Sequence, residues 1–453
     1  MEKGTTVGCA KIAALFDAGT FVETGAYMKR GSDLTGVVCG YGAINGKLVY
    51  AFAQDSDRKK GAIDALQAEK IAMLYAMAQK NGAPIVGMFD SVGAVVTDGA
   101  SVLSAYGKLL KVVSDASGIV PQIAIINGVC AGMAATVAAM FDVVVTIKDQ
   151  SELYVNAPFL AGKEIGTTAY TAENGLATIA AENEGDAVAK AIKLVSMLPS
   201  NCEEGVAIED ITDDINRTVA VEGLVGKDLI NTLCDCASFV SLGDAYATEM
   251  ITGLANFGGV TCGVVANDAT VNGGVITCDG AKKAAKLISF CDSFSIPVIT
   301  LVDSIGVATN AEAEGAPLAA QLGKLAMAYA SADTAKIGVI CGKAYGAAFT
   351  LMGSKALGAD MVYALPTSEI SVMAPASAVA FLWNDKITES TTRQDLVEKW
   401  TNECASPEAA AADGSIDDVV ASAELRQRIC AAVYMLMMKN SNAPARKHCN
   451  LPL

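Results

Sequence analysis

Histidine is nearly absent from the sequence: its 453 residues include one, His448, close to the carboxyl end. Ser-His-Asp hydrolases, Cys-His nucleophiles and multi-histidine metal sites all need imidazole groups beside the reacting atoms. A single terminal histidine does not supply them, and we expect it at the surface or at an interface. Any chemistry of this chain must therefore depend on other groups, and we expect no metal site.

Positive charge is also scarce. The chain has 33 Lys and Arg against 49 Asp and Glu, a formal net charge of −16, and no dense basic run. Nucleic-acid-binding proteins concentrate Lys and Arg on one face, so we expect no nucleic-acid partner. The 13 cysteines include no CxxC pair. We interpret them as small buried hydrophobic residues in a reducing compartment.

Long apolar runs are missing too. The amino-terminal stretch MEKGTTVGCAKIAALFD has no apolar core long enough for a signal peptide. The most apolar region, residues 118–147, is interrupted by Pro121, Gly132 and Asp142, which favours a buried strand and helix over a membrane span. With 52% hydrophobic and 18% charged residues, the composition is typical of a globular α/β protein, which we expect in the cytoplasm.

The sequence repeats itself at one constant offset. Residues 40–55, GYGAINGKLVYAFAQD, match residues 253–268, GLANFGGVTCGVVAND, and residues 68–91 match 281–304. One slipped residue later, two small-residue turns align, GVCAGMAATV and GKAYGAAFTL, with Gly132 opposite Gly346. This repetition predicts two homologous domains, which we place at residues 1–240 and 241–453.

Each half shows the same order of elements. We expect a β-hairpin first, marked in the amino-terminal half by Asn45-Gly46. Helices at 62–79 and 281–294 follow, then a short apolar strand, then helices at 100–117 and 316–331, then another strand and the turn. Alternating strands and helices predict a mostly parallel sheet in each half. We expect residues 156–244 to join the halves, and residues 391–440 to form a helical arm.

The two turns place backbone amides where a ligand can reach them. Small residues let the chain bend tightly after a strand, and the first N–H groups of a helix have no partner within it. Two such amides can form an oxyanion hole for a thioester enolate, worth about 3 to 4 kcal/mol per donor. The alternative is that the small residues only permit close packing. The matching position of two copies in duplicated halves favours the functional interpretation.

An ordered string of motifs carries a family resemblance. The motifs are GAPIVGMFDSVGA, SGIVPQIAIINGVCAGMAA, KAAKLISFCDSFSIPVITLVD, GKAYGAAFTLMGSKALGADMVYALPTSEISVMAP, DGSIDDVV and the closing ARKHCNLPL. Over residues 30–453 the chain resembles the carboxyltransferase subunit of biotin-dependent acyl-CoA carboxylases and decarboxylases. That family has an α/β fold of two tandem homologous crotonase-like (ClpP/crotonase) domains with ββα repeats. Its members assemble as homo-hexamers, dimers of trimers, with sites between domains of different subunits.

The resemblance implies a division of labour between the turns. Amides of Gly132 and Met133 would hold the acyl-CoA thioester oxygen, in an acyl-CoA domain. Amides of Gly346, Ala347 and Ala348 would hold the ureido oxygen of biotin, in a biotin domain. The further residues expected to contact the cofactors are Ser91, Gly93, Ala131, Tyr345, Phe349 and Thr350.

The same resemblance explains the shortage of catalytic side chains. Biotin that has released CO2 can itself take the α-proton of the acyl-CoA, so the protein supplies position and two anion sites. The dipeptide Met438-Lys439 resembles a biotin attachment site but lacks the flanking strands. We therefore expect biotin on a separate biotin carboxyl carrier protein and a coenzyme A thioester as substrate.

The sequence departs from the family pattern at four places, one of which is the loop after Asp303, SIGVATNAEAEGAP, which lacks the family's more glycine-rich form. The family's DSGGAR motif appears as residues 90–95, DSVGAV, and its double glycine at the first turn appears as Gly132-Met133. Thr350 replaces an Asp that the family associates with the choice of acyl chain. The acyl chain, propionyl/methylmalonyl or acetyl/malonyl, therefore stays open.

Several functions remain in competition. The leading one is a carboxyltransferase that works with a biotin carboxylase. The second is the carboxyltransferase subunit of a sodium-pumping methylmalonyl- or glutaconyl-CoA decarboxylase, with a membrane subunit as partner. A third is a non-catalytic assembly scaffold whose site has decayed at Val92, Val95, Met133 and Thr350. A crotonase-type hydratase is disfavoured because residues 128–140 contain no Asp or Glu.

Overall fold

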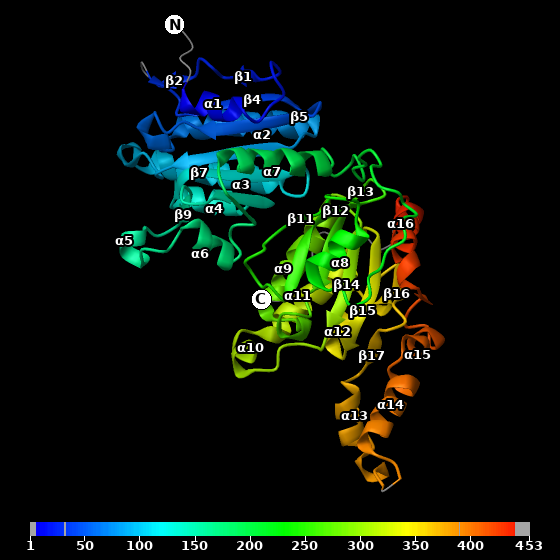
Figure 1. The fold of residues 1–453 in the computed structure, drawn as a ribbon. Helices are drawn as coiled ribbons and strands as arrows, with labels where there is room; N and C mark the ends of the chain where they lie inside the picture. Colours follow the sequence, from blue (N-terminus) through cyan, green and yellow to red (C-terminus); the bar gives the residue numbers. More distant parts are fainter. Residues whose placement is uncertain (1–5, 31–32, 389, 440–453) are drawn as a thin grey trace. The chain divides into compact units, whose positions relative to one another are not determined.

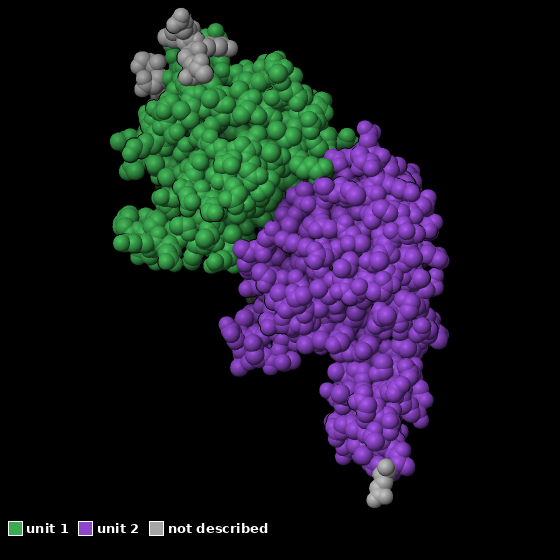
Figure 2. All heavy atoms as spheres, in the orientation of Figure 1, with its two compact units in different colours: residues 1–205 green, residues 206–453 purple. Residues whose placement is uncertain are grey.

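The computed structural model describes residues 6–30, 33–388 and 390–439 (Figure 1). Its contacts divide the chain into unit 1, residues 1–205, and unit 2, residues 206–453 (Figure 2). The functional domains expected at 1–240 and 241–453 stay a prediction. His448 lies outside the described residues.

Unit 1 is built on a sheet of eight strands in the order β1-β4-β5-β6-β7-β8-β10, with β9 paired to β7. The pairs β1–β4 and β4–β5 are antiparallel and the others are parallel. The elements are α1 (Val7–Ala13), β1 (Val22–Thr24), β2 (Lys29–Arg30), β3 (Asp33–Leu34), β4 (Val37–Ile44), β5 (Lys47–Gln54), α2 (Ala65–Asn81), β6 (Ile85–Ser91), α3 (Ala100–Ala116), β7 (Gln122–Ala131), α4 (Met133–Ala139), β8 (Val143–Ile147), β9 (Glu152–Tyr154), α5 (Pro158–Ala161), α6 (Thr168–Glu173), β10 (Ile179–Ala181) and α7 (Glu184–Met197).

Unit 2 repeats this plan, with the strand order β11-β12-β13-β14-β15-β16-β18 and β17 paired to β15. Its elements are α8 (Gly226–Leu233), β11 (Val240–Ser241), β12 (Met250–Phe257), β13 (Val260–Asn267), α9 (Cys278–Ser293), β14 (Val298–Ser304), α10 (Ala311–Gly315), α11 (Leu318–Ser331), β15 (Lys336–Tyr345), α12 (Ala347–Leu351), β16 (Met361–Ala364), β17 (Glu369–Ser371), α13 (Pro375–Leu382), α14 (Arg393–Cys404), α15 (Pro407–Ala412), β18 (Asp418–Val419) and α16 (Leu425–Leu436). The predicted α/β fold with two homologous, mostly parallel sheets is confirmed.

Local sequence signals explain where the elements begin and turn. The hairpin of β4 and β5 turns at Asn45 and Gly46, whose φ angles of 48° and 78° are those of a type I′ turn. Helix α2 begins after Asp64, whose side chain accepts a hydrogen bond from the Gln67 amide. It ends at Gly82, which has a φ of 57°. The helix predicted at 62–79 is therefore confirmed, displaced by two to three residues.

The helical arm predicted at 391–440 is wrong as a continuous element. Helices α14 and α15 are followed by β18, which joins the sheet parallel to β16. Gly414, with a φ of 79°, turns the chain after α15. Asp417 then accepts a hydrogen bond from the Val362 amide at 2.8 Å, which fastens β18 to the sheet edge. In Figure 1, α14 packs beside the preceding helix α13, and both project away from the sheet of unit 2.

A buried ion pair anchors the last helix of unit 2. The Arg426 side chain on α16 is fully buried and pairs with Asp235 at 2.6 Å. Asp235 also accepts the amides of Gly258 and Gly259, which form the β12–β13 turn. A buried charge is tolerable only when it is paired and hydrogen-bonded in this way.

None of the described helices is long and apolar enough to cross a membrane.

Candidate active site

The first turn joins β7 to α4. Ala131 ends the strand. Gly132 follows with a φ of 63° and a ψ of −130°, a backbone conformation that residues other than glycine rarely adopt. The Gly132 amide donates to the Tyr154 carbonyl at 2.9 Å, so it is already engaged by β9. The amides of Met133 and Ala134 follow at the start of the helix, where N–H groups have no intrahelical partner.

The second turn joins β15 to α12 with the same geometry. Gly346 has a φ of 53° and a ψ of −123°. Its amide donates to the Ser371 carbonyl of β17 at 2.9 Å, as Gly132 does to β9. The amides of Ala347 and Ala348 then open α12. The two turns therefore have the same backbone structure. In each, the glycine amide is hydrogen-bonded to a short neighbouring strand, β9 in unit 1 and β17 in unit 2.

A register slip brings the neighbouring strand close to each turn. The pairing of β6 with β7 shifts between Phe89 and Ser91, and that of β14 with β15 shifts between Val302 and Ser304. A Cβ at Gly128 would lie only 2.4 Å from an Asp90 carboxylate oxygen, so glycine is required there.

Ser91 and Gly93 shape the loop beside the first turn. Ser91 is fully buried, its hydroxyl donates to the Gly93 carbonyl at 3.3 Å and accepts the Gly93 amide at 3.2 Å. Gly93 has a φ of 110°, and a Cβ there would lie 3.7 Å from the Ala131 carbonyl oxygen. Ser304 and Gly306 repeat this loop in unit 2. Both predicted residues thus support the turn from the adjacent strand.

A cavity of about 560 Å³ opens in front of the second turn. It brings together three of the residues predicted from sequence, Gly346, Phe349 and Thr350. Its other walls come from β17 and from helices α14 and α15, which sequence reasoning did not connect to the turn. They are Ile370, Ser371, Val372, Glu403, Cys404, Ala409, Ala410, Asp413 and Ser415.

The remaining predicted residues of unit 2 do not line the cavity, and they differ in burial: Ala347 is exposed, whereas Tyr345 and Ala348 are buried. Ala348 is fully buried, and Tyr345 is only 6% exposed. The Tyr345 hydroxyl donates to Glu369, and burial followed by this hydrogen bond raises the pKa of Tyr345. Tyr345 stands opposite Ser371, whereas in unit 1 Ala131 stands opposite Tyr154. The tyrosine of this pair therefore lies on β15 in unit 2 but on β9 in unit 1. The pairing register is needed to see this difference.

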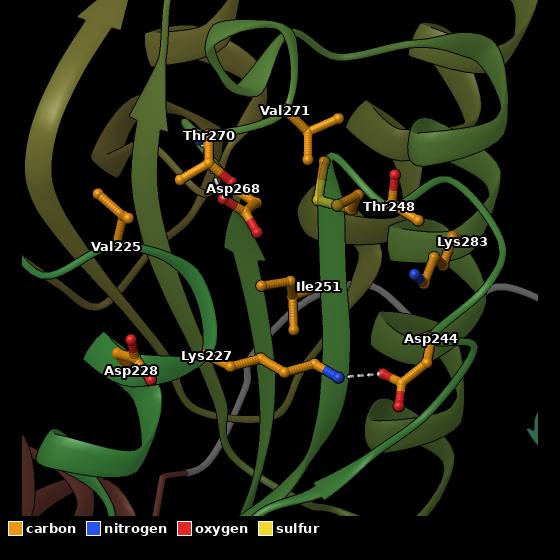
Figure 3. Close-up of a pocket in the computed structure, with 11 residues that line it drawn as sticks. Val225, Lys227, Asp228, Asp244, Thr248, Ile251, Asp268, Thr270, Val271 and Lys283 are labelled. Atoms are coloured by element: carbon orange, nitrogen blue, oxygen red, sulfur yellow. Dashed lines mark hydrogen bonds and ion pairs between the residues drawn. The ribbon is translucent and has the colours of Figure 1, made fainter.

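A second cavity of unit 2, about 340 Å³ in volume, contains no residue predicted from sequence (Figure 3). Lys227 and Asp244 form an ion pair across it at 2.7 Å. Lys283 lies on its wall and donates to the Tyr246 carbonyl at 2.6 Å. Burial lowers the pKa of Lys283 to about 8. The cavity belongs to the start of β12 and the end of β13, a different place from the glycine turn.

The described residues form no metal-binding cluster, and Lys439 is not placed as an attachment site would be. No group of three or more His, Cys, Asp or Glu within the described ranges could hold a metal ion. Lys439 donates to an Asp360 carboxylate oxygen at 2.9 Å and to the Thr334 carbonyl at 3.0 Å. It is therefore engaged by unit 2 rather than presented on a turn.

Comparison with known proteins agrees with this geometry. The carboxyl transferase domain model matches residues 1–451. Methylmalonyl-CoA decarboxylase subunit alpha of Veillonella parvula is 35% identical over 100% of this chain and 94% of its own. The carboxyltransferase subunit of propionyl-CoA carboxylase from Haloferax mediterranei is 33% identical over the same shares. The transcarboxylase 12S structure, a hexamer assembly with methylmalonyl-CoA and methylmalonic acid bound, has a TM-score of 0.93 at 31% identity and covers 98% of this chain and 92% of its own.

Proposed function

The chain belongs to the carboxyl transferase family, and from this premise we propose that it moves a carboxyl group between biotin on a separate carrier protein and a short-chain acyl-CoA. It is a carboxyltransferase of the propionyl-CoA carboxylase or methylmalonyl-CoA decarboxylase type. We assign propionyl-CoA and methylmalonyl-CoA as the substrate pair. The names of both relatives and the ligands of the transcarboxylase 12S structure support this assignment.

The duplicated glycine turn is the observation that carries the proposal. In unit 1, Gly132 supplies the bend and the Met133 amide is the donor for the thioester oxygen, because the Gly132 amide is taken by Tyr154. Ala131, Ser91 and Gly93 hold the turn in place. A preorganised amide donor is worth about 3 to 4 kcal/mol when charge develops on that oxygen.

In unit 2, the residues fit biotin. The amides of Ala347 and Ala348 are the donors for its ureido oxygen, and Phe349, Ile370 and Val372 give the 560 Å³ cavity apolar walls suited to a ring. When bound, biotin supplies the carboxyl group and the base that takes the α-proton. Gly346, Tyr345 and Thr350 shape this site, and no protein side chain is required to act as the base.

Partners follow from the same assignment. We propose a biotin carboxyl carrier protein, with either a biotin carboxylase or a membrane decarboxylase subunit, and a cytoplasmic homo-hexamer of this chain. The hexamer assembly of transcarboxylase 12S supports the oligomer. Exposed apolar side chains support it as well, including Phe159 on α5 and Phe381 on α13, which are 84% and 79% exposed. The decarboxylase direction is favoured by the Veillonella relative and the carboxylase direction by the Haloferax relative.

A carboxyl-exchange assay tests the proposal. Purified protein with methylmalonyl-CoA labelled in its free carboxyl group and free biotin should yield labelled carboxybiotin, and malonyl-CoA serves as the comparison substrate. Calorimetry with propionyl-CoA measures binding separately. Absence of both exchange and binding would instead support a non-catalytic scaffold. Co-purification then decides the direction, since a biotin carboxylase and a multi-span membrane protein identify different complexes.

A further inference from the structure

One turn of unit 1 carries a basic run that its counterpart in unit 2 lacks. Residues 58–60 read Arg-Lys-Lys in a chain with a net charge of −16. By the repeat register, Val271, Asn272 and Gly273 stand at the corresponding turn of unit 2 and carry no charge. The basic turn is therefore a property of unit 1 alone.

The backbone of this turn is unfavourable for lysine. Lys59 and Lys60 have φ angles of 50° and 52°, in the left-handed region where residues other than glycine are strained. In unit 2 the same path uses Asn272 and Gly273, with φ angles of 50° and 66°. Strain of this kind is retained where the side chain contributes something that glycine cannot.

The three basic side chains differ in how they are used. Arg58 is half-buried, donates to the Thr35 carbonyl at 3.0 Å and pairs with Asp55 at 3.5 Å, so it fastens the turn to the sheet. Lys59 and Lys60 are exposed. Within residues 6–30, 33–388 and 390–439, neither lysine ammonium group has a hydrogen-bond or ion-pair partner. Their two charges are free to bind a ligand.

The turn lies against the strand end that supports the first glycine turn. The Lys60 carbonyl accepts the Val92 amide at 3.2 Å. A Cβ at Gly61 would lie 1.8 Å from the Asp90 carbonyl oxygen, so the backbones are in close contact. Gly93, one residue further, approaches Ala131, which precedes Gly132. The basic turn therefore packs against the loop that supports the glycine turn assigned to the acyl-CoA.

We propose that Lys59 and Lys60 bind the phosphate groups of the coenzyme A substrate. This inference rests on the proposed function and adds the residues that recognise the anionic end of the substrate. An ammonium group binds phosphate as a point charge. In an acidic protein such local positive charge is needed to collect a polyanion, because the overall field repels it.

The test compares two thioesters that differ only in their carrier. The double variant K59A/K60A is assayed with methylmalonyl-CoA and with the methylmalonyl thioester of N-acetylcysteamine, which has no phosphate. We expect kcat/KM for the CoA thioester to fall at least tenfold and that for the cysteamine thioester to stay within twofold. The matched control K108A/K111A removes the same charge from α3 and should change neither. An equal loss with both thioesters, or no loss with either, overturns the proposal.

Two more measurements separate ligand binding from a structural role. K59R/K60R keeps both charges and should retain CoA affinity within about threefold by calorimetry. K60G should lose CoA affinity while its Tm stays at or above that of the wild type, because glycine relieves the left-handed backbone. A lower Tm for K60G together with unchanged CoA affinity would make the residue structural.

Failure of this proposal is distinguishable from failure of the proposed function. Wild-type protein that exchanges no carboxyl group contradicts the proposed function. Wild-type and K59A/K60A proteins that bind coenzyme A equally in calorimetry contradict the lysine assignment alone.

Discussion

Unit 1 and unit 2 share a strand order and a glycine turn but differ in what surrounds the turn. In unit 1, Met133 is 40% exposed, and two exposed lysines, Lys59 and Lys60, lie on the turn beside the supporting loop. In unit 2, the turn faces a cavity walled by β17 and by the helices that follow it. The backbone turn is thus common to both units, and the side chains around it are what differs.

The difference arises mainly after the third short strand. In unit 1, β9 leads into the short helices α5 and α6 and then to β10. In unit 2, β17 leads into α13, α14 and α15 before β18 closes the sheet. The longer excursion provides Glu403, Cys404 and Asp413 as walls for the cavity. The cavity of unit 2 therefore arises from the longer connection between β17 and β18, while the sheet keeps the same strand order as in unit 1.

The largest expected effect of a substitution is on the buried Arg426–Asp235 ion pair of unit 2. Arg426→Met removes the partner of Asp235 and should lower the free energy of unfolding of unit 2 by about 3 to 5 kcal/mol, since a buried charge is left uncompensated. Urea unfolding followed by circular dichroism measures the effect. Arg428→Ala, on the exposed face of the same helix, is the control and should cost less than about 1 kcal/mol. Equal effects of the two variants would contradict the anchoring role.

The glycine turn itself is the next target. In the variant Gly346→Val, the Cβ would lie 3.0 Å from the Val372 carbonyl oxygen, and the φ of 53° disfavours valine. The turn should therefore shift and misalign its amide donors. Carboxyl exchange should fall by about 100-fold or more, as expected for loss of such donors. Gly132→Val meets no atom within 4 Å and should be penalised by its φ alone. Size-exclusion chromatography checks that the oligomer persists. Full activity of Gly346→Val would refute the biotin-site assignment.

Equivalent lysines of the two units should lose different amounts of stability on substitution. Lys70 in unit 1 donates to the Val37 carbonyl at 2.9 Å and to Glu23 at 3.4 Å. Lys70→Met leaves these groups unsatisfied and should destabilise by about 1 to 3 kcal/mol. Lys283→Met also leaves carbonyls unsatisfied, those of Tyr246 and Ala247, but it removes a charged amine that burial disfavours. At pH 7 it should therefore cost less stability than Lys70→Met.

The pH dependence separates these cases. Burial lowers the pKa of Lys283 from 10.5 to about 8. Between these values the unfolded chain binds a proton that the folded chain has released, so wild-type stability rises with pH. Lys283→Met should lose that rise, so its stability relative to the wild type should be highest below pH 8 and fall towards pH 10.5. A variant whose stability keeps the wild-type slope would contradict a buried neutral amine.

The smallest effect concerns access to the two sites. Cys404 is exposed and lines the cavity of unit 2. Its adduct with a bulky maleimide should reduce carboxyl exchange with biotin about fivefold to tenfold, a change of about 1 kcal/mol, and leave the Kd for propionyl-CoA unchanged. Cys404→Ala, treated in the same way, controls for labelling at exposed Cys236. Inhibition that persists in the Ala variant would place the sensitive thiol elsewhere.

Much of the sheet could be predicted because its signals are local or repeated. The pair Asn45-Gly46 fixes a hairpin, and Pro84 and Asp90 bound a short apolar strand. The constant offset then transfers each element from one half to the other. The turns were recognisable because Gly132 and Gly346 follow buried strands and precede small residues.

The parts that escaped prediction depend on contacts between distant residues. Strand β18 has two residues, Asp418 and Val419, too few to show a strand pattern. The partners of the Gly132 and Gly346 amides lie on three-residue strands further along the chain. Consequently the sequence did not show that the Gly132 and Gly346 amides, both expected as donors, are already bonded within the protein.

The bond from the Gly346 amide to Ser371 sets the direction of the next two amides before any ligand arrives. The amide dipoles are therefore oriented when the protein folds, and they need little reorganisation energy during a reaction. By the same reasoning, loosening β17 at a distance from the ligand should slow turnover more than it weakens ground-state affinity, since a mobile dipole matters most when the ligand gains charge.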